Sequence, residues 1–129
     1  MDQASTHRRA LIVEDEIVIA MDLEQAMYEL GFETSELAGT PSRAFSLAMS
    51  SKPDIALVDV CLEGGREGVE AARWLREVCE VPVVFVTAYT DAETVERIHD
   101  QVPDAPILSK IDWRKRLADA VSEVRAHTC

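Results

Sequence analysis

Short apolar runs alternate five times with segments of helical periodicity along this chain of 129 residues. The apolar runs are expected to be strands, and they cover residues 10–13, 32–38, 55–58, 83–87 and 107–109. After each run, apolar residues recur at the spacing of an amphipathic helix; in the third helix these are Val69, Ala72, Leu75 and Val78. This alternation predicts a parallel sheet with helices on both faces, because each crossover helix packs back onto the sheet. We expect an α/β fold of the doubly wound, flavodoxin-like (βα)5 type, a five-stranded parallel sheet with strand order 2-1-3-4-5.

Residues with strong positional preferences mark the ends of several expected helices. Thr40 followed by Pro41 suits an N-cap and a first helical residue. Either Thr90 or Asp91 can cap the fourth helix, and Gly31 stands where a left-handed residue would end the first. These local signals agree with the alternation of strands and helices.

The length of the chain favours a single domain, which we place at residues 9–126, between tails at residues 1–8 and 127–129. No apolar run approaches the roughly 20 residues of a membrane span, and the first residues lack the apolar core of a signal peptide. The three cysteines include no Cys-x-x-Cys pair and indicate neither a disulfide framework nor a zinc site. We therefore expect a cytoplasmic domain that does not bind membranes.

The acidic balance of the sequence restricts the class of partner. Asp and Glu number 24 against 13 Lys and Arg, which gives a formal net charge of -11. Binding to a nucleic-acid backbone needs clustered basic residues, so direct nucleic-acid binding is not expected. Cations and basic partner surfaces fit this charge better, although for most of the acids solubility is a sufficient account.

Charged and polar side chains stand where four of the expected strands end. Glu14 and Asp15 follow the first strand, and Asp59 ends the third. Thr87 ends the fourth strand and Lys110 follows the fifth. Because the carboxyl ends of parallel strands meet at one edge, these residues are expected to face one crevice. Three carboxylates so close together repel one another unless a cation lies among them, and a hard ion with oxygen ligands such as Mg²⁺ fits best.

This set of groups suits phosphoryl transfer to an aspartate, with Asp59 as the acceptor. That chemistry needs a carboxylate nucleophile, a metal ion, and hydroxyl and ammonium donors. An aspartyl-phosphate phosphohydrolase is an alternative, but such enzymes generally place a second Asp two residues on, where Cys61 stands. A flavin carrier of the same topology is disfavoured, because the acids after the first strand would repel a ligand phosphate.

Four segments together resemble the receiver domain of two-component response regulators. They are Leu-Ile-Val-Glu-Asp-Glu at 11–16, Asp-Ile-Ala-Leu-Val-Asp at 54–59, Val-Phe-Val-Thr-Ala-Tyr at 84–89, and Lys110. The resemblance covers nearly the whole chain, from about residue 8 to residue 124. It implies that Asp59 accepts a phosphoryl group from a phosphohistidine on a sensor histidine kinase or a phosphotransfer protein.

The same resemblance assigns roles to the other residues of the crevice. Asp15, with Glu14 acting through water, would hold Mg²⁺ together with Asp59 and the backbone carbonyl of Cys61. Lys110 would pair with the phosphoryl oxygens. The domain would then be a phosphoacceptor switch that catalyses only its own phosphorylation and dephosphorylation, not an enzyme in the usual sense.

A receiver of this kind is expected to pass its signal to a second protein or domain. Thr87 would move its hydroxyl to the phosphoryl group and so couple the site to a surface formed by the fourth helix, fifth strand and fifth helix, where partners of this family usually dock. The output is either a docked partner protein or a domain of a larger regulator or hybrid kinase, and a homodimer is also compatible with the family.

The sequence departs from the family pattern at three places. Ile107 stands where the family usually has a Tyr or Phe switch residue, and Ile111 stands where Pro usually follows the lysine. The loop at residues 62–67 lacks the usual Met-Pro and is one residue longer. Ile107 and Ile111 favour an alternative, a receiver-like interaction module that signals without phosphate. Thr87 taken alone would be an ordinary hydroxyl at a strand end, and its neighbours in the crevice suggest more. Glu16 is interpreted as a first-turn acid favoured by the helix dipole.

Overall fold

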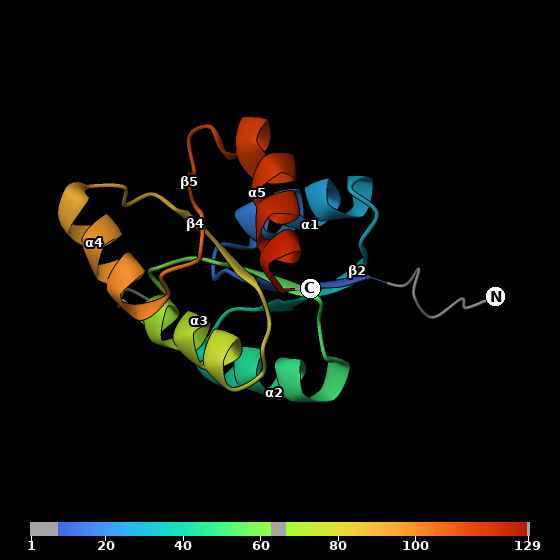
Figure 1. Ribbon diagram of the computed structural model, residues 1–129. Coiled ribbons are helices and arrows are strands. Elements are labelled where there is room, and N and C mark those ends of the chain that lie inside the picture. Colours follow the sequence, from blue (N-terminus) through green and yellow to red (C-terminus); the bar gives the residue numbers. More distant parts are fainter. Residues whose placement is uncertain (1–7, 63–66, 129) are drawn as a thin grey trace.

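The computed structural model describes residues 8–62 and 67–128. In chain order the elements are β1 (Arg9–Val13), α1 (Ile17–Glu29), β2 (Glu33–Ala38), α2 (Pro41–Ser51), β3 (Ile55–Val58), α3 (Glu67–Glu77), β4 (Val83–Thr87), α4 (Ala92–Gln101), β5 (Ile107–Ser109) and α5 (Trp113–Thr128). The strands form one parallel sheet in the order β2-β1-β3-β4-β5 (Figure 1). The predicted doubly wound, flavodoxin-like fold is therefore confirmed.

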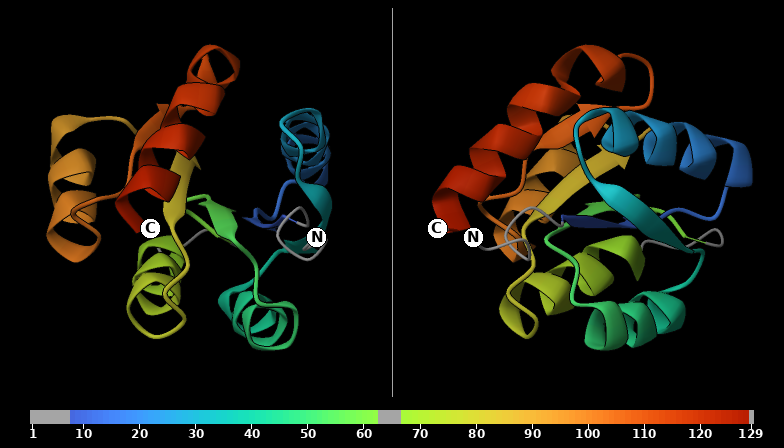
Figure 2. Two further views of the ribbon diagram at one scale, coloured as in Figure 1. Left: turned by 45° about the vertical axis from the view of Figure 1, so that its right-hand side comes forward. Right: turned by 90° about the vertical axis from the view of Figure 1, so that its right-hand side faces the viewer.

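Helices cover both faces of the sheet and bury a separate apolar cluster on each side. Helices α1 and α5 lie on one face, whereas α2, α3 and α4 pack on the other (Figures 1 and 2). Strand β1 shows how the two clusters are filled: Leu11 and Val13 point to the α2–α3–α4 side, and Ala10 and Ile12 to the α1–α5 side. Side chains of a strand alternate between faces, so an unbroken apolar run is what a sheet covered on both sides requires.

The helix ends follow the local signals of the sequence. The Thr40 hydroxyl accepts a hydrogen bond from the Arg43 N–H at 3.1 Å, which caps α2. Of the two residues expected to cap α4, Asp91 does so by accepting from the Thr94 N–H at 3.1 Å. Gly31, just beyond α1, has a φ of 96°, in the left-handed region that favours glycine.

Some expected positions differ from the structure. Strand β1 begins at Arg9, one residue earlier than expected, and β2 begins at Glu33, one residue later. Val78, expected on the apolar face of the third helix, lies beyond the end of α3 and is 60% exposed. Helix α5 continues to Thr128, inside the segment assigned to a C-terminal tail. Residues 63–66 of the unusual loop lie outside the described residues.

The register of the sheet brings the ends of four strands to one edge. Val13 is aligned with Val58, and Val58 with Phe85. Immediately beyond these pairs, the Asp59 N–H donates to the Val13 carbonyl at 2.9 Å. The Lys110 N–H donates likewise to the Thr87 carbonyl at 2.9 Å. Segments that are far apart in the sequence therefore share this edge.

None of the helices that the structure describes is both long enough and apolar enough to cross a membrane.

Candidate functional site

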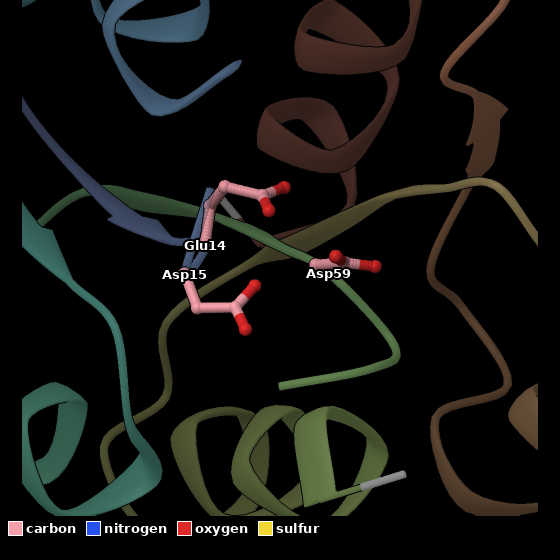
Figure 3. Close-up of side chains that lie close together, drawn as sticks. All are labelled: Glu14, Asp15 and Asp59. Atoms are coloured by element: carbon pink, nitrogen blue, oxygen red, sulfur yellow. The ribbon is translucent and has the colours of Figure 1, made fainter. Parts of the chain in front are cut away.

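Three carboxylates gather where β1 and β3 end. Glu14, Asp15 and Asp59 each offer an oxygen that lies within 4.8 Å of the others (Figure 3). The first two residues follow β1 directly and the third follows β3. Glu14 and Asp59 are 4% and 5% exposed, whereas Asp15 is open to solvent. The cluster is therefore buried on one side and reachable from water on the other.

Lys110 places its ammonium group against these carboxylates. Its Nζ lies 2.9 Å from Asp59 Oδ2 and 3.1 Å from Glu14 Oε1. A third carboxylate oxygen, Glu16 Oε1, is 3.0 Å from the same nitrogen. Burial alone lowers the pKa of Lys110, but the hydrogen bonds to Asp59, Glu16 and Glu14 outweigh it and raise the pKa above its ordinary value. Lys110 therefore remains a cation within the site.

Glu14 is the carboxylate that this arrangement satisfies least. Burial and the neighbouring charge of Asp59 raise the pKa of Glu14 to about 7, although the Glu16 N–H and Lys110 oppose the shift. Its Oε2 accepts from the Glu16 N–H at 3.1 Å. Its Oε1 is buried and accepts no hydrogen bond among the described residues, despite the nearby ammonium. One lysine thus does not compensate the buried negative charge completely.

The donor set fits a hard divalent cation. The cluster offers carboxylate oxygens only, which are the ligands that Mg²⁺ and Ca²⁺ prefer. The buried Glu14 Oε1 without a hydrogen bond and the exposed Asp15 are what an ion that keeps some of its water would use. The residues present are consequently compatible with the expected Mg²⁺.

Two further predicted residues are linked to Lys110 and Asp59: the Thr87 carbonyl accepts from the Lys110 N–H, and Cys61 contacts Asp59. Thr87 is fully buried, and its hydroxyl accepts a hydrogen bond from the Tyr89 N–H at 3.1 Å. The Cys61 N–H donates to Asp59 Oδ1 at 3.3 Å. Both Asp59 oxygens are therefore engaged, one by Cys61 and the other by Lys110. The roles of the Thr87 hydroxyl and of the Cys61 carbonyl remain predictions.

Gly68 is a residue of the site that the sequence analysis did not identify. Its N–H donates to the Val60 carbonyl at 3.0 Å. A Cβ on Gly68 would overlap the main-chain oxygen of Asp59 and would lie 2.7 Å from that of Val60. Helix α3 thus starts in direct contact with the backbone that carries Asp59, and only glycine fits there. In the sequence, the position of Gly68 at the end of a glycine-containing loop is the feature that could have pointed to it.

Glu16 has a different position from the one expected. It is the N-cap residue of α1, not a residue of the first turn, and its side chain makes no capping hydrogen bond. Its carboxylate contacts Lys110 instead. The interpretation as a first-turn acid is therefore wrong, and the contact that replaces it spans 94 positions of sequence.

The two isoleucines that depart from the family pattern have different environments. Ile107 is half-buried against the apolar cluster beneath α2, α3 and α4. Ile111 follows Lys110 and is 94% exposed. Its N–H donates to the Ser109 hydroxyl at 3.1 Å.

Sequence comparisons place this chain among bacterial regulators. The profile of the response regulator receiver domain matches residues 10–121. The chain is 38% identical over 97 residues to the transcriptional regulatory protein PdtaR of Mycobacterium tuberculosis, covering 75% of this chain and 47% of that protein. It is 43% identical over 82 residues to the phyllosphere-induced regulator PhyR of Methylorubrum extorquens, covering 63% of this chain and 31% of that protein. The matches thus span half or less of these relatives.

Solved structures agree with the sequence comparisons. The signal receiver domain of a modulated diguanylate cyclase from Desulfovibrio desulfuricans G20 superimposes with a TM-score of 0.82 at 30% identity, covering 95% of this chain and 96% of that one. The receiver domain of PhyR from Erythrobacter litoralis gives a TM-score of 0.76 at 28% identity, with coverages of 94% and 92%. The likeness extends over nearly the whole chain.

Proposed function

Since this chain belongs to the family of response regulator receiver domains, we propose that it is a phosphoacceptor switch of two-component signalling and that Asp59 accepts the phosphoryl group. The observation that carries the proposal is the environment of Asp59. Its carboxylate is 5% exposed, lies 2.9 Å from Lys110 Nζ and belongs to a cluster that suits a divalent cation. A buried nucleophile with a cation site and an ammonium beside it is what transfer to an aspartate requires.

The phosphoryl donor is a phosphohistidine on a sensor histidine kinase or a phosphotransfer protein. An oxygen of Asp59 forms the bond to phosphorus while the bond from phosphorus to the histidine nitrogen breaks, and the nitrogen leaves with the electron pair. The hydrogen bonds from Lys110 and Cys61 to the two Asp59 oxygens hold the carboxylate in place before transfer. The domain catalyses only this step and the later loss of the phosphoryl group.

Asp15, Asp59 and the Cys61 carbonyl would hold Mg²⁺, with Glu14 acting through water. The cation would supply positive charge to offset the charge on the phosphoryl oxygens. Glu14 needs such an ion most, because its carboxylate is buried with one oxygen that accepts no hydrogen bond among the described residues. Lys110 would pair with a phosphoryl oxygen once Asp59 has reacted.

Thr87 would transmit the change. Its hydroxyl accepts from the Tyr89 N–H before phosphorylation. A hydroxyl that moves to donate to a phosphoryl oxygen would alter that bond and the loop that leads to α4. We propose that the face formed by α4, β5 and α5 then engages a protein partner or an output domain, in the cytoplasm.

The test is labelling of the purified protein with acetyl phosphate, followed by intact-mass measurement. We expect the mass of one phosphoryl group to be added in the presence of Mg²⁺ and not in the presence of EDTA. Asp59→Asn should prevent labelling, and Glu96→Gln, which changes an exposed acid on α4, should not. Labelling of the Asp59→Asn protein at the wild-type level would overturn the proposal.

A second candidate function is an interaction module that signals without phosphate. Ile107 and the 94% exposed Ile111 favour it, because they stand at the two positions where the family usually has an aromatic ring and a proline. NMR spectra with and without Mg²⁺ and beryllofluoride separate the two functions. Shifts that spread from Asp59 to α4 and α5 support the switch, and shifts confined to the site support the module.

A further inference from the structure

Glu16 lies at the solvent side of the acceptor site. Its Oε1 is 3.0 Å from Lys110 Nζ, and its side chain is 63% exposed. We propose that Glu16 is a positioning residue, whose carboxylate holds Lys110 before phosphorylation and gives up the ammonium to the incoming phosphoryl group. This inference rests on the proposed function and adds to it a residue that limits the rate of phosphoryl transfer.

All the hydrogens of the Lys110 ammonium group are in use. An ammonium group has three hydrogens to donate. Nζ donates to three carboxylate oxygens: Asp59 Oδ2 at 2.9 Å, Glu16 Oε1 at 3.0 Å and Glu14 Oε2 at 3.3 Å. A phosphoryl oxygen can therefore bind Lys110 only if one of these contacts is lost.

Burial determines which contact is lost. The side chains of Glu14 and Asp59 are 1% and 6% exposed, so as the donor arrives, before Asp59 has reacted, losing Lys110 would leave either buried charge with one compensating contact fewer. Such a change is strongly unfavourable. The Glu16 carboxylate is exposed and can be hydrated at once, and exposed ion pairs contribute little to stability. Glu16 is thus the partner that exchanges.

The backbone around Glu16 allows this exchange without unfolding α1. Glu16 is the N-cap residue of the helix, but its side chain accepts no capping hydrogen bond. Its N–H donates to Glu14 Oε2 at 3.1 Å, and its carbonyl accepts from the Ala20 N–H at 2.9 Å. The main chain is held by these bonds while the carboxylate is free to rotate into water.

The expected effect of Glu16 is to slow phosphorylation. In transfer from acetyl phosphate, an Asp59 oxygen bonds to phosphorus while the bond to the acetate oxygen breaks, and acetate leaves with the electron pair. The Glu16 charge repels the anionic donor and competes with it for Lys110. Removing that charge should therefore speed the reaction, by about three- to tenfold at low ionic strength and by less at high salt.

The experiment compares initial labelling rates by acetyl phosphate and Mg²⁺ for wild type, Glu16→Gln, Glu16→Asp and Glu96→Gln. The Glu96→Gln protein controls for the loss of one exposed negative charge. Glu16→Asp keeps the charge but is one methylene shorter, so it should react faster than wild type if contact with Lys110 matters. The proposal would be overturned if Glu16→Gln were labelled no faster than Glu96→Gln. It would also be overturned if Glu16→Asp were labelled at the wild-type rate.

A spectroscopic measurement reports the contact itself. We expect the side-chain carboxyl ¹³C signal of Glu16 to move towards its value in an unfolded peptide when Mg²⁺ and beryllofluoride are added. An unchanged signal contradicts the exchange.

The proposed function and the role of Glu16 can fail separately. Absence of Asp59-dependent labelling in every protein removes the proposed function, whereas normal wild-type labelling with no effect of Glu16→Gln removes only the role of Glu16.

Discussion

Glu14 is the residue at which the charges of the site conflict most. Its carboxylate is buried beside Asp59, and its pKa is raised to about 7. Lys110 offsets part of this charge but also serves Asp59 and Glu16. A proton and a metal ion are therefore alternative ways of neutralising the same group.

The raised pKa of Glu14 predicts how stability depends on pH without metal. Between its ordinary value of 4.5 and about 7, the folded protein holds a proton on Glu14 that the unfolded chain has lost. This contribution to folding is present below the lower value and is lost as pH rises through the higher one. For wild type we expect the free energy of unfolding to fall by about 1–3 kcal/mol between pH 5 and pH 8 because of this group. In Glu14→Gln this part of the fall should be absent.

Urea unfolding in EDTA at several pH values measures this effect. The comparison is between wild type and Glu14→Gln, in the slope of the free energy of unfolding against pH, since titrating groups remote from Glu14 contribute equally to both. An exposed acid on β2, Glu36, supplies the control, and Glu36→Gln should keep the wild-type slope. Parallel slopes for wild type and Glu14→Gln would show that the burial of Glu14 has no thermodynamic consequence.

At the scale of elements, α3 and the end of β3 are held in close contact by Gly68. The overlap of a Cβ with the Asp59 main-chain oxygen means that helix and strand must separate if a larger residue is introduced. Because alanine is a better helix former than glycine, any loss of stability in Gly68→Ala comes from this contact and not from helix propensity. The position of the acceptor thus depends on the start of α3.

We expect Gly68→Ala to lower the free energy of unfolding by about 1–3 kcal/mol and to slow labelling of Asp59. Gly39→Ala is the matched control. A Cβ on Gly39 would lie 3.8 Å from its nearest neighbour, Asp15 Cα, which is ordinary van der Waals contact. Chemical denaturation of both variants gives the comparison, and equal stabilities would show that α3 moves aside at little cost.

The helix ends could be predicted from the sequence wherever they depend on residues close by in the chain. The cap at Thr40 and the left-handed Gly31 depend on neighbouring residues, and both were identified. Val78 was misplaced because the helical spacing of apolar residues continues past the point where α3 ends. The requirement for glycine at position 68 comes from a backbone carbonyl nine positions away, and no periodicity reports such a contact.

At the scale of the whole molecule, the parallel sheet accounts for the site. The strand order predicted from alternation was enough to bring Asp59 and Lys110 to one edge, although they are 51 positions apart. It could not show that Lys110 also contacts Glu16, because that depends on the direction of one exposed side chain. Topology thus predicts which residues share an edge, and side-chain geometry decides which of them touch.

Binding of Mg²⁺ should stabilise the whole domain. A ligand that binds only the folded state adds about 2.7 kcal/mol at a concentration 100 times its dissociation constant. We expect the midpoint of urea unfolding to rise with Mg²⁺ for wild type and for Glu36→Gln, but not for Asp15→Asn. Because Asp15 is the exposed member of the cluster, its substitution should change the fold little. An equal rise of the midpoint in all three proteins would show that Mg²⁺ binds at a site that does not include Asp15.

The central claim is that Asp59 carries the phosphoryl group, and the most direct test identifies the modified residue. After incubation with acetyl phosphate and Mg²⁺, borohydride reduction converts an aspartyl phosphate to homoserine, which peptide mass spectrometry locates. We predict that this conversion occurs at Asp59, and only when both donor and Mg²⁺ are present. Conversion at Asp15 or at another acid, or no conversion at all, would contradict the account.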